Sequence, residues 1–175
     1  GRQSLFMSRF LSPQVATLVN QQGLHAAMGE QRREISVVSV DLRGFTAFAG
    51  ANTSEAVIAL LRDYYDAVGA AVQEFEGTVK DYAGDGVLIP VGAPVAVSNH
   101  AGIAIELALR IQTLVAPVTA ARHTSTYPLA RGVGVASGEV TVGVIGGEGR
   151  LEYAAVGQAV NFASRLCDKA PAGEI

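Results

Sequence analysis

Residues 35–46 have the sequence Ile-Ser-Val-Val-Ser-Val-Asp-Leu-Arg-Gly-Phe-Thr, and the rest of the fold is organised around them. The first six are apolar in pattern and rich in β-branched side chains, which is typical of a short buried strand. Asp41 ends this strand. Because a carboxylate there is costly unless it pairs with a charge or binds a cation, Asp41 is the first candidate functional residue.

The turn after Asp41, Arg43-Gly44-Phe45-Thr46, is the second candidate. Such a turn can present consecutive backbone N–H groups, as phosphate-binding loops do. The alternative is that Asp41 caps a helix and stands beside an ordinary turn. The residues of this segment alone leave both interpretations open.

Beyond the turn, helical and extended patterns alternate. The patterns predict helices over 54–75, 98–115 and 159–167, and strands over 78–82, 86–91, 131–136 and 140–145. Ala83-Gly84-Asp85 separates two of these strands and predicts a hairpin. The order β-α-β-β-α-β-β-α predicts an α+β fold in which helices cover one face of a mainly antiparallel sheet, close to the ferredoxin-like βαββαβ sandwich.

Residues 1–33 differ in pattern and are expected to form a helical linker or dimerisation segment ahead of a domain at 34–175. Ser12-Pro13 provides an N-cap and a first helical position, so we expect a short helix, a break and a second helix that ends at Gly23. This segment is too small for a core of its own. It is either a surface appendage or a linker that packs against a partner or carries a signal from an upstream domain.

The composition excludes several classes of protein. The 175 residues are 49% apolar and 17% charged, which suits one folded domain. A net charge of −3 argues against nucleic-acid binding through a basic face. Cys167 is the single cysteine, and the three histidines lack metal-ligand spacing, so neither an internal disulfide nor a zinc site is expected. No apolar run reaches the roughly 18 residues of a membrane span, which predicts a cytoplasmic domain.

Gly84-Asp85-Gly86, at the tip of the predicted hairpin, is the third candidate. Asp-Gly is a common hairpin turn, so the segment alone predicts only a turn. A second aspartate at a strand end can nevertheless converge with Asp41. Two carboxylates together with phosphate oxygens are the usual protein contribution to a pair of Mg²⁺ ions.

Asn161 and Arg165 are the fourth candidate, four residues apart on one face of a predicted helix. An amide and a guanidinium suit a ribose and a phosphate in transfer, although a solvated polar face is the simpler alternative. Gly132-Val-Gly-Val-Ala-Ser-Gly138 does not have the spacing of a nucleotide-binding fingerprint. We interpret these as strand glycines that make room for close backbone packing.

Four segments, taken in order, resemble the class III adenylate/guanylate cyclase catalytic domain over residues 34–175. They are Val40-Asp-Leu-Arg-Gly-Phe-Thr46, Gly77-Thr-Val-Lys-Asp-Tyr-Ala-Gly-Asp-Gly86, Gly132-Val-Gly-Val-Ala-Ser-Gly138 and Tyr153-Ala-Ala-Val-Gly-Gln-Ala-Val-Asn-Phe-Ala-Ser-Arg165. In that family two chains pair head to tail, and each active site takes its metal ligands from one chain and its Asn and Arg from the other. The resemblance therefore implies a homodimer with two equivalent sites.

The resemblance also assigns the site residues. It implies that Asp41, Leu42 and Asp85 form a site for Mg²⁺ or Mn²⁺, with two ions per active site. It makes Arg43, Gly44, Phe45 and Thr46 the phosphate-binding segment that follows Leu42. It implies that Asn161 orients the ribose and that Arg165 stabilises charge at the α-phosphate. The family continues past residue 175 through strands that bring a phosphate-contacting Lys, so the resemblance implies a fold truncated at the C-terminus.

The base-reading positions depart from the family pattern. Adenylate cyclases place Lys four residues before the second metal aspartate and guanylate cyclases usually place Glu; here that position is Asp81, beside Lys80. The second position is Ala154, where Asp or Thr is usual for adenine and Cys is frequent for guanine. ATP is favoured by its frequency in the family. The chemistry of Asp81 favours GTP, because an ionised carboxylate accepts hydrogen bonds and guanine offers donors.

The sequence thus predicts a purine nucleotide cyclase that converts ATP to 3′,5′-cyclic AMP and pyrophosphate. The alternatives are a guanylate cyclase that uses GTP, or a catalytically weak module that binds nucleotide or dimerises to transmit a signal. The expected partners are the nucleoside triphosphate, a second copy of the chain and an upstream sensor domain. The expected location is the cytoplasm, in a protein that can be membrane-anchored.

Overall fold

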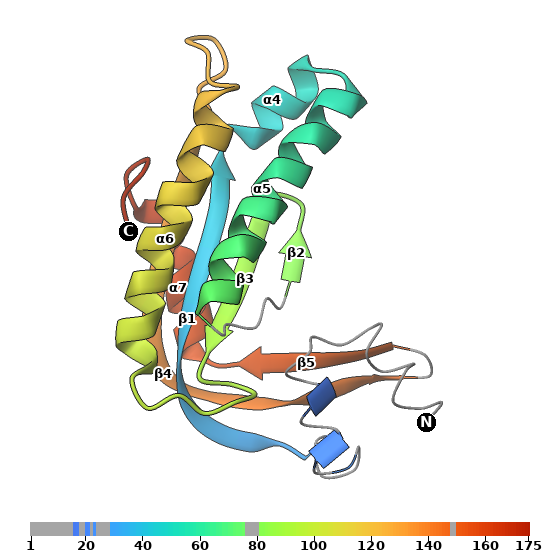
Figure 1. Cartoon of the computed structure of the whole chain (residues 1–175), viewed down its shortest axis with the longest axis vertical. Coiled ribbons are helices and arrows are strands. Elements are labelled where there is room, and N and C mark those ends of the chain that lie inside the picture. Colours follow the sequence, from blue (N-terminus) through green and yellow to red (C-terminus); the bar gives the residue numbers. More distant parts are fainter. Residues whose placement is uncertain (1–15, 18–19, 22, 24–28, 76–80, 148–149) are drawn as a thin grey trace.

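The computed structural model describes residues 16–17, 20–21, 23, 29–75, 81–147 and 150–175. Within them a five-stranded sheet has the order β2-β3-β1-β4-β5, and every neighbouring pair is antiparallel (Figure 1). The strands are β1 (Gln31–Arg43), β2 (Asp81–Ala83), β3 (Gly86–Val91), β4 (Ala130–Gly147) and β5 (Arg150–Val156). Most of the predicted helical leader lies outside the described residues.

Helices form where the apolar periodicity predicts them. They are α5 (Ser54–Glu74), α6 (His100–Ala120) and α7 (Gln158–Lys169), and the structure adds α4 (Phe45–Ala51). The Thr53 side chain caps α5 by accepting a hydrogen bond from the Ala56 N–H. By length and composition α6 is apolar enough to cross a membrane, yet Leu107 and Ile111 on its inner face belong to the core. The α+β prediction is confirmed, and α4 is an additional short helix.

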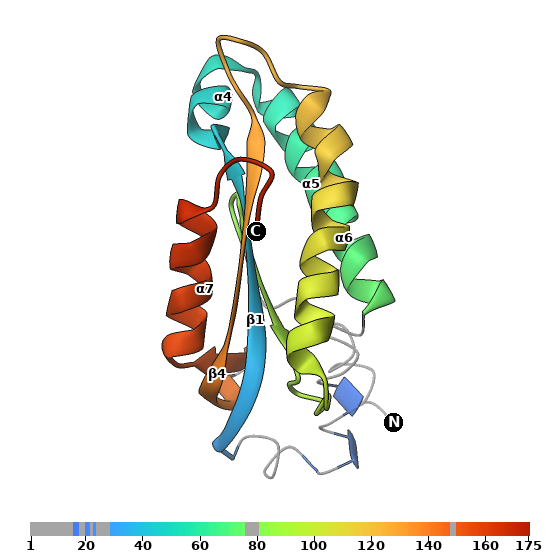
Figure 2. The same ribbon diagram turned by 90° about the vertical axis from the view of Figure 1, so that its left-hand side faces the viewer.

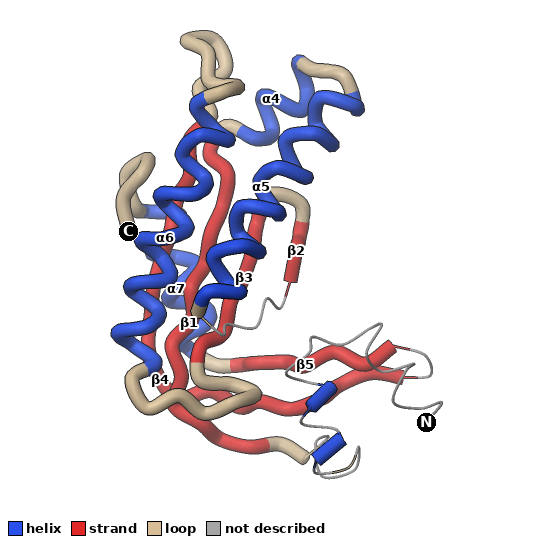
Figure 3. Tube along the Cα trace, viewed as in Figure 1, coloured by secondary structure: helices blue, strands red, loops and turns tan. Residues whose placement is uncertain are grey.

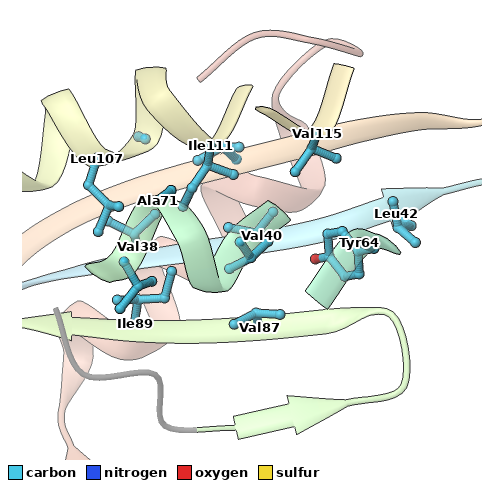
Figure 4. Close-up of a cluster of buried hydrophobic side chains, with 14 of the residues drawn as sticks. Val38, Val40, Leu42, Tyr64, Ala71, Val87, Ile89, Leu107, Ile111 and Val115 are labelled. Carbon is cyan, nitrogen blue, oxygen red and sulfur yellow. The ribbon is translucent and has the colours of Figure 1, made fainter. Parts of the chain in front are cut away.

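One face of the sheet packs against α5 and α6. Side chains alternate along β1, so Val38, Val40 and Leu42 point to the same face. Figure 4 shows them against Tyr64 of α5 and Ile111 of α6. These side chains are almost fully buried, and they form the larger of two apolar clusters. Burial of this kind supplies most of the stability of a domain of this size.

The other face carries α7, which corrects the prediction that helices cover one face only (Figure 2). Glycines in β4 explain the close approach of this helix. A Cβ atom on Gly132 would stand 2.8 Å from the carbonyl oxygen of Cys167, and one on Gly134 would overlap backbone atoms of Ala163 and Cys167. The interpretation of these glycines as room for backbone packing is confirmed.

A second correction concerns β4, which is one strand where two were predicted. Its pairing with β1 runs without interruption from Gln31 opposite Val142 to Arg43 opposite Ala130. Ser137-Gly138 therefore lies inside a strand and is not a turn, because the neighbouring β1 satisfies its backbone groups. β5, which the sequence analysis missed, pairs with the last part of β4, and the two strands extend together past the helices (Figure 3).

Candidate active site

The fold brings the two predicted metal aspartates to neighbouring strands. Asp41 lies near the end of β1, and its partner in the antiparallel pairing with β3 is Gly86, the residue directly after Asp85. The Leu42 N–H donates a hydrogen bond to the Asp85 carbonyl oxygen at 3.2 Å. Both aspartates are half-buried. The predicted convergence of two strand-end carboxylates is therefore present at the level of the backbone.

The hairpin that carries Asp85 is fixed from two sides. Ala83 pairs with Gly86, so Gly84-Asp85 forms a two-residue loop in which Gly84 has a φ of 60°, as tight hairpin turns require. The Tyr65 hydroxyl of α5 donates to the Gly84 carbonyl oxygen, and the Tyr65 ring packs on Tyr82 with centroids 4.3 Å apart. Burial, and then the charge of Asp85, raises the pKa of Tyr65.

Tyr65 is a site residue that sequence reasoning missed. Its place in the apolar pattern of α5 indicated a core residue and nothing more. The hydrogen bond to the turn depends on how the hairpin packs beside α5, which periodicity cannot show. Two adjacent tyrosines, Tyr64 and Tyr65, were the available signal, since each brings a hydroxyl that needs a partner when buried.

The Arg43 side chain makes contacts within the protein that the sequence did not predict. Its Nε donates to Oδ1 of Asp41 at 3.1 Å. Its Nη2 donates to the carbonyl oxygens of Cys167 and Ala170, the second at 3.0 Å. The guanidinium therefore lies between the candidate metal carboxylate and the C-terminal end of α7.

The remaining residues of the predicted phosphate-binding segment form the turn into α4. Gly44 has a φ of 78°, and a Cβ there would collide with the Pro128 carbonyl, so glycine is required. Its carbonyl oxygen accepts the first helical hydrogen bond, from Phe48, at 3.0 Å. Phe45 packs against the core and Thr46 is exposed. The contact of this segment with phosphate stays a prediction.

The donor set at this end of the sheet fits a hard divalent cation. Asp41, Asp85 and the main-chain carbonyl of Leu42 offer oxygen ligands, which Mg²⁺ and Mn²⁺ prefer. Among the described residues no group of three or more acidic, His or Cys side chains gathers, so further ligands would have to be phosphate oxygens or water. Gly132 leaves open the space beside Asp41, because a Cβ there would lie 2.7 Å from Oδ1.

Two buried groups next to this site are protonated at neutral pH. Burial raises the pKa of the Cys167 thiol to about 12, and the thiol donates to the Gly132 carbonyl oxygen at 3.4 Å. Burial, and then the charge of Asp41, raises the pKa of Tyr64. Within the described part of the chain the Tyr64 hydroxyl is buried without a hydrogen-bond partner. Neither group is placed to act as a nucleophile, because neither is exposed.

Asn161 and Arg165 lie on the face of α7 that points away from the sheet. Ala163 and Cys167 are the buried residues of this helix nearest to Arg165, and each is about 200° around the helix from it at 100° per residue. Asn161 and Arg165 are accordingly exposed. One chain therefore does not bring them to Asp41, which lies beneath the same helix.

Apolar side chains stand beside these two polar residues. Phe162 is 52% exposed and Leu166 is 47% exposed, each next in sequence to Asn161 or Arg165. Large apolar groups grouped on one helix face are typical of a surface that another protein covers. The outer face of α7 thus combines the predicted catalytic side chains with contact area.

The base-reading residues are only partly described. β2 ends at Ala83, and Asp85 lies in the turn, so strand alternation relates Asp81 to Ala83 but does not extend to Asp85. The backbone therefore does not place Asp81 and Asp85 on one strand face. Ala154 is buried in β5 opposite Gly143. Lys80 lies outside the described residues, and its role stays a prediction.

With this geometry in place, comparison with known proteins defines the class. Residues 28–175 match the family described as the adenylate and guanylate cyclase catalytic domain. The chain belongs to this family. The resemblance seen in the sequence is confirmed, and so is the fold class that it implied.

Individual relatives include cyclases of both base specificities. Adenylate cyclase 1 of Rhizobium meliloti (strain 1021) is 34% identical over 77% of this chain and 20% of its own length. A crystal structure of the guanylyl cyclase Cya2 has a TM-score of 0.76 at 32% identity, covering 83% of this chain and 74% of that one. The guanylate cyclase domain of RhGC from Catenaria anguillulae, in complex with GTP, has a TM-score of 0.71 at 27% identity, covering 82% and 77%. This chain spans about a fifth to a quarter of the length of the curated relatives it matches.

Proposed function

We propose that this domain converts ATP to 3′,5′-cyclic AMP and pyrophosphate as a homodimer with two composite active sites. The observation that carries the proposal is the outward direction of Asn161 and Arg165 on α7, away from the aspartates of their own chain. In a two-fold dimer each chain can present its α7 to the aspartates of the other, so both sites are completed at once. The exposed Phe162 and Leu166 supply apolar contact area for that pairing.

The reaction joins the 3′-oxygen of the ribose to the α-phosphorus while pyrophosphate leaves. Bound Mg²⁺ or Mn²⁺ lowers the pKa of the 3′-hydroxyl and neutralises charge on the triphosphate. Asp41 and Asp85 would hold two such ions, with the Leu42 carbonyl as a further ligand. The Gly44 turn, which leads from the end of β1 into Phe45 and Thr46 at the start of α4, would orient the phosphates.

The second chain would supply positioning and charge. Asn161 has both donors and an acceptor, which suits a ribose with hydroxyl and ring oxygens. Arg165 presents a fixed cationic fork to the α-phosphate, where charge builds up during the attack. Arginines in comparable roles in phosphoryl transfer contribute about 10³–10⁵-fold in rate. No side-chain nucleophile is required, consistent with the buried and protonated Cys167.

GTP is the second candidate substrate, because of Asp81. The N1–H and N2–H₂ edge of guanine donates hydrogen bonds to a carboxylate, whereas adenine N1 is an acceptor and gains nothing from it. A solved relative holds GTP. The frequency of ATP in the family still favours adenine, so the two substrates are to be compared directly.

The test is incubation of the purified protein with ATP or GTP and Mn²⁺, with chromatographic separation of the products. Cyclic AMP formed faster than cyclic GTP at equal substrate supports the proposal. Faster cyclic GTP formation identifies a guanylate cyclase. Absence of both products, with nucleotide still bound, would identify the catalytically weak module and contradict the proposal.

Subunit mixing tests the composite site separately. Asp41→Ala and Arg165→Ala homodimers are both expected to be inactive, but each heterodimer retains one intact site. A random mixture holds half heterodimers with one site of two, so activity should return to about a quarter of the wild-type value. Continued inactivity after demonstrated subunit exchange would show that Asp41 and Arg165 do not act from opposite chains.

A further inference from the structure

The Arg43 side chain joins two parts of the molecule that serve different active sites in the proposed dimer. Through Nε it contacts the carboxylate of Asp41, its neighbour on the same face of β1. Through Nη2 it contacts the Cys167 and Ala170 carbonyls at the end of α7. One rigid, planar group thus makes all three contacts, which a flexible point charge cannot reproduce.

The contacts with α7 satisfy hydrogen-bond acceptors at the C-terminal end of the helix. The last turn of a helix leaves carbonyl oxygens without intrahelical partners, and its end carries partial negative charge. The Arg43 guanidinium satisfies two of these acceptors in a half-buried position, where hydrogen bonds from a charged donor are strongest. The close approach of helix and strand over Gly132 and Gly134 makes the contact possible.

We propose that Arg43 is a positioning residue that couples the metal half of one active site to the nucleotide half of the other. The inference rests on the proposed composite dimer. Asp41 of a chain serves the site in which that chain holds the metals, while α7 of the same chain presents Asn161 and Arg165 to the second site. A shift of the Asp41 carboxylate is transmitted through Arg43 to the end of α7, and the reverse also holds.

The alternative is that Arg43 contacts the substrate phosphate, as the resemblance implies for its segment. The two roles differ in which subunit they affect. A phosphate contact acts only in the chain that supplies Asp41 to the working site. A tether on α7 also acts in the chain that supplies Arg165, because the Arg43 of that chain lies on the sheet side of α7 and Arg165 lies on the exposed side.

The heterodimer described above separates these roles, because it has a single working site. The metal subunit carries Arg165→Ala and supplies Asp41 to that site; the helix subunit carries Asp41→Ala and supplies Asn161 and Arg165. Arg43→Ala is then introduced into one subunit at a time, with different affinity tags to purify the heterodimer. Turnover and the Mn²⁺ concentration for half-maximal activity are measured for each.

In the metal subunit, Arg43→Ala should raise the Mn²⁺ concentration for half-maximal activity at least about fivefold, since Asp41 loses the group that orients it. In the helix subunit it should lower kcat by at least about fivefold and leave the Mn²⁺ requirement unchanged. Loss of activity confined to the metal subunit would overturn the coupling and favour a phosphate contact. An inactive heterodimer with Arg43 intact would instead count against the proposed function.

Thiol labelling tests the tether without catalysis. Cys167 is the only cysteine of the chain and is buried at the end of α7 that Arg43 contacts. Arg43→Ala should increase its rate of reaction with a disulfide reagent at least about tenfold, because the helix end opens more often. Millimolar Mn²⁺, which binds the Asp41 carboxylate that Arg43 orients, should change the rate in the wild type and not in Arg43→Ala.

Two variants serve as controls for labelling. Arg110→Ala removes an exposed arginine that pairs with Glu74 on the opposite side of the sheet, so the rate should match the wild type. Arg43→Lys should give an intermediate rate, because an ammonium group does not span the three acceptors. Equal rates in the wild type and Arg43→Ala, or a wild-type rate in Arg43→Lys, would overturn the proposal.

Discussion

The two faces of the sheet are built differently. The face beneath α5 and α6 is lined by aliphatic side chains such as Val38, Val40 and Ile89, all fully buried. The face that carries α7 has aliphatic side chains such as Ile35 and Val37 towards the start of β1. Towards the end of β1 it holds Asp41 and Arg43, beside a buried thiol and the glycines of β4. The first face is filled by side chains throughout, whereas around Gly132 and Gly134 the second brings two backbones close together beside charged groups.

The difference separates stability from chemistry. Apolar side chains gain free energy from burial in proportion to area, whereas a buried carboxylate costs free energy unless a partner offsets it. A strand with both kinds of face can therefore anchor the core with alternate residues and hold ligands with those between. Val40 and Leu42 face α5 and α6, while Asp41 between them faces α7.

The largest expected effect is loss of activity without loss of fold. Asp41→Ala or Asp85→Ala should reduce cyclase activity below about a tenth of the wild type at saturating Mn²⁺, because each removes a ligand from a two-metal site. Product formation and thermal unfolding are measured on the same samples. Retention of more than about a tenth of the activity would rule out the metal assignment.

A substitution in the apolar cluster between the sheet and α6 should reduce stability and leave the activity of the folded protein unchanged. Ile111→Ala leaves a cavity between α6 and the sheet and should lower the free energy of unfolding by about 2–5 kcal/mol. Its activity per folded molecule should stay near the wild-type value, as measured by denaturant titration alongside the cyclase assay. A destabilised Asp41→Ala, or an inactive but stable Ile111→Ala, would break the division between the faces.

The close packing of α7 on β4 is tested by adding one methyl group to the strand. Gly134→Ala forces a Cβ onto backbone atoms of Ala163 and Cys167, so it should cost about 1–3 kcal/mol and lower activity as the helix is displaced. Gly50→Ala on α4 is the matched control, since a Cβ there meets nothing within 4 Å. Equal stability of the two variants, measured by urea unfolding, would show that α7 does not depend on this close approach.

The sequence predicted more of the fold than of the contacts in the candidate site. The periodicity of 54–75 and the β-branched run at 35–40 predict α5 and β1, because local pattern and burial agree there. Ser137-Gly138 was predicted to break a strand, and β5 was missed. Both errors arise because pairing with a distant strand decides what a glycine-containing segment does.

For the site, the sequence showed which residue types are present, but it did not show where their side chains point or what they contact. Asp41, Asp85, Asn161 and Arg165 stand in recognisable motifs, and the backbone brings the two aspartates together as expected. The partners of Arg43 depend on a helix that begins 115 positions later, counting from 43 to 158 along the chain. No local pattern encodes such a contact.

The preference for ATP over GTP is expected to change moderately when Asp81 is substituted. Asp81→Lys replaces an acceptor by a donor and should shift the ATP:GTP preference towards ATP by at least about tenfold, or roughly 1.4 kcal/mol. The ratio of kcat/KM for the two nucleotides is the measurement. An unchanged ratio would place Asp81 outside the base pocket and direct attention to Lys80.

The smallest effect concerns Tyr64, whose buried hydroxyl lies in the apolar cluster beneath α5 and α6. Tyr64→Phe should raise the free energy of unfolding by up to about 1 kcal/mol at neutral pH, because it removes a buried donor with no partner among the described residues. Burial raises the pKa of Tyr64, so the unfolded phenol ionises first, near pH 10, and the wild type loses stability as pH rises above that value.

Unfolding of Tyr64→Phe and wild type across the alkaline range gives the check. The advantage of the variant should grow above pH 10, since phenylalanine has no proton to release from the unfolded chain. Parallel curves for the two proteins would contradict a buried phenol that stays protonated.

The position of β1 in the sheet has a consequence for how the site opens and closes. Along 36–41 β1 is hydrogen-bonded to β3 on one side and β4 on the other, so exchange of its amide protons with solvent requires disruption of the whole sheet. Within the described residues β2 has three paired positions and one neighbouring strand, so the hairpin can open while β1 stays closed. The backbone hydrogen bonds around Asp41 should therefore open much less often than those of the hairpin that carries Asp85. A nucleotide–metal complex that binds both should slow deuterium uptake at the hairpin strongly and at β1 hardly at all.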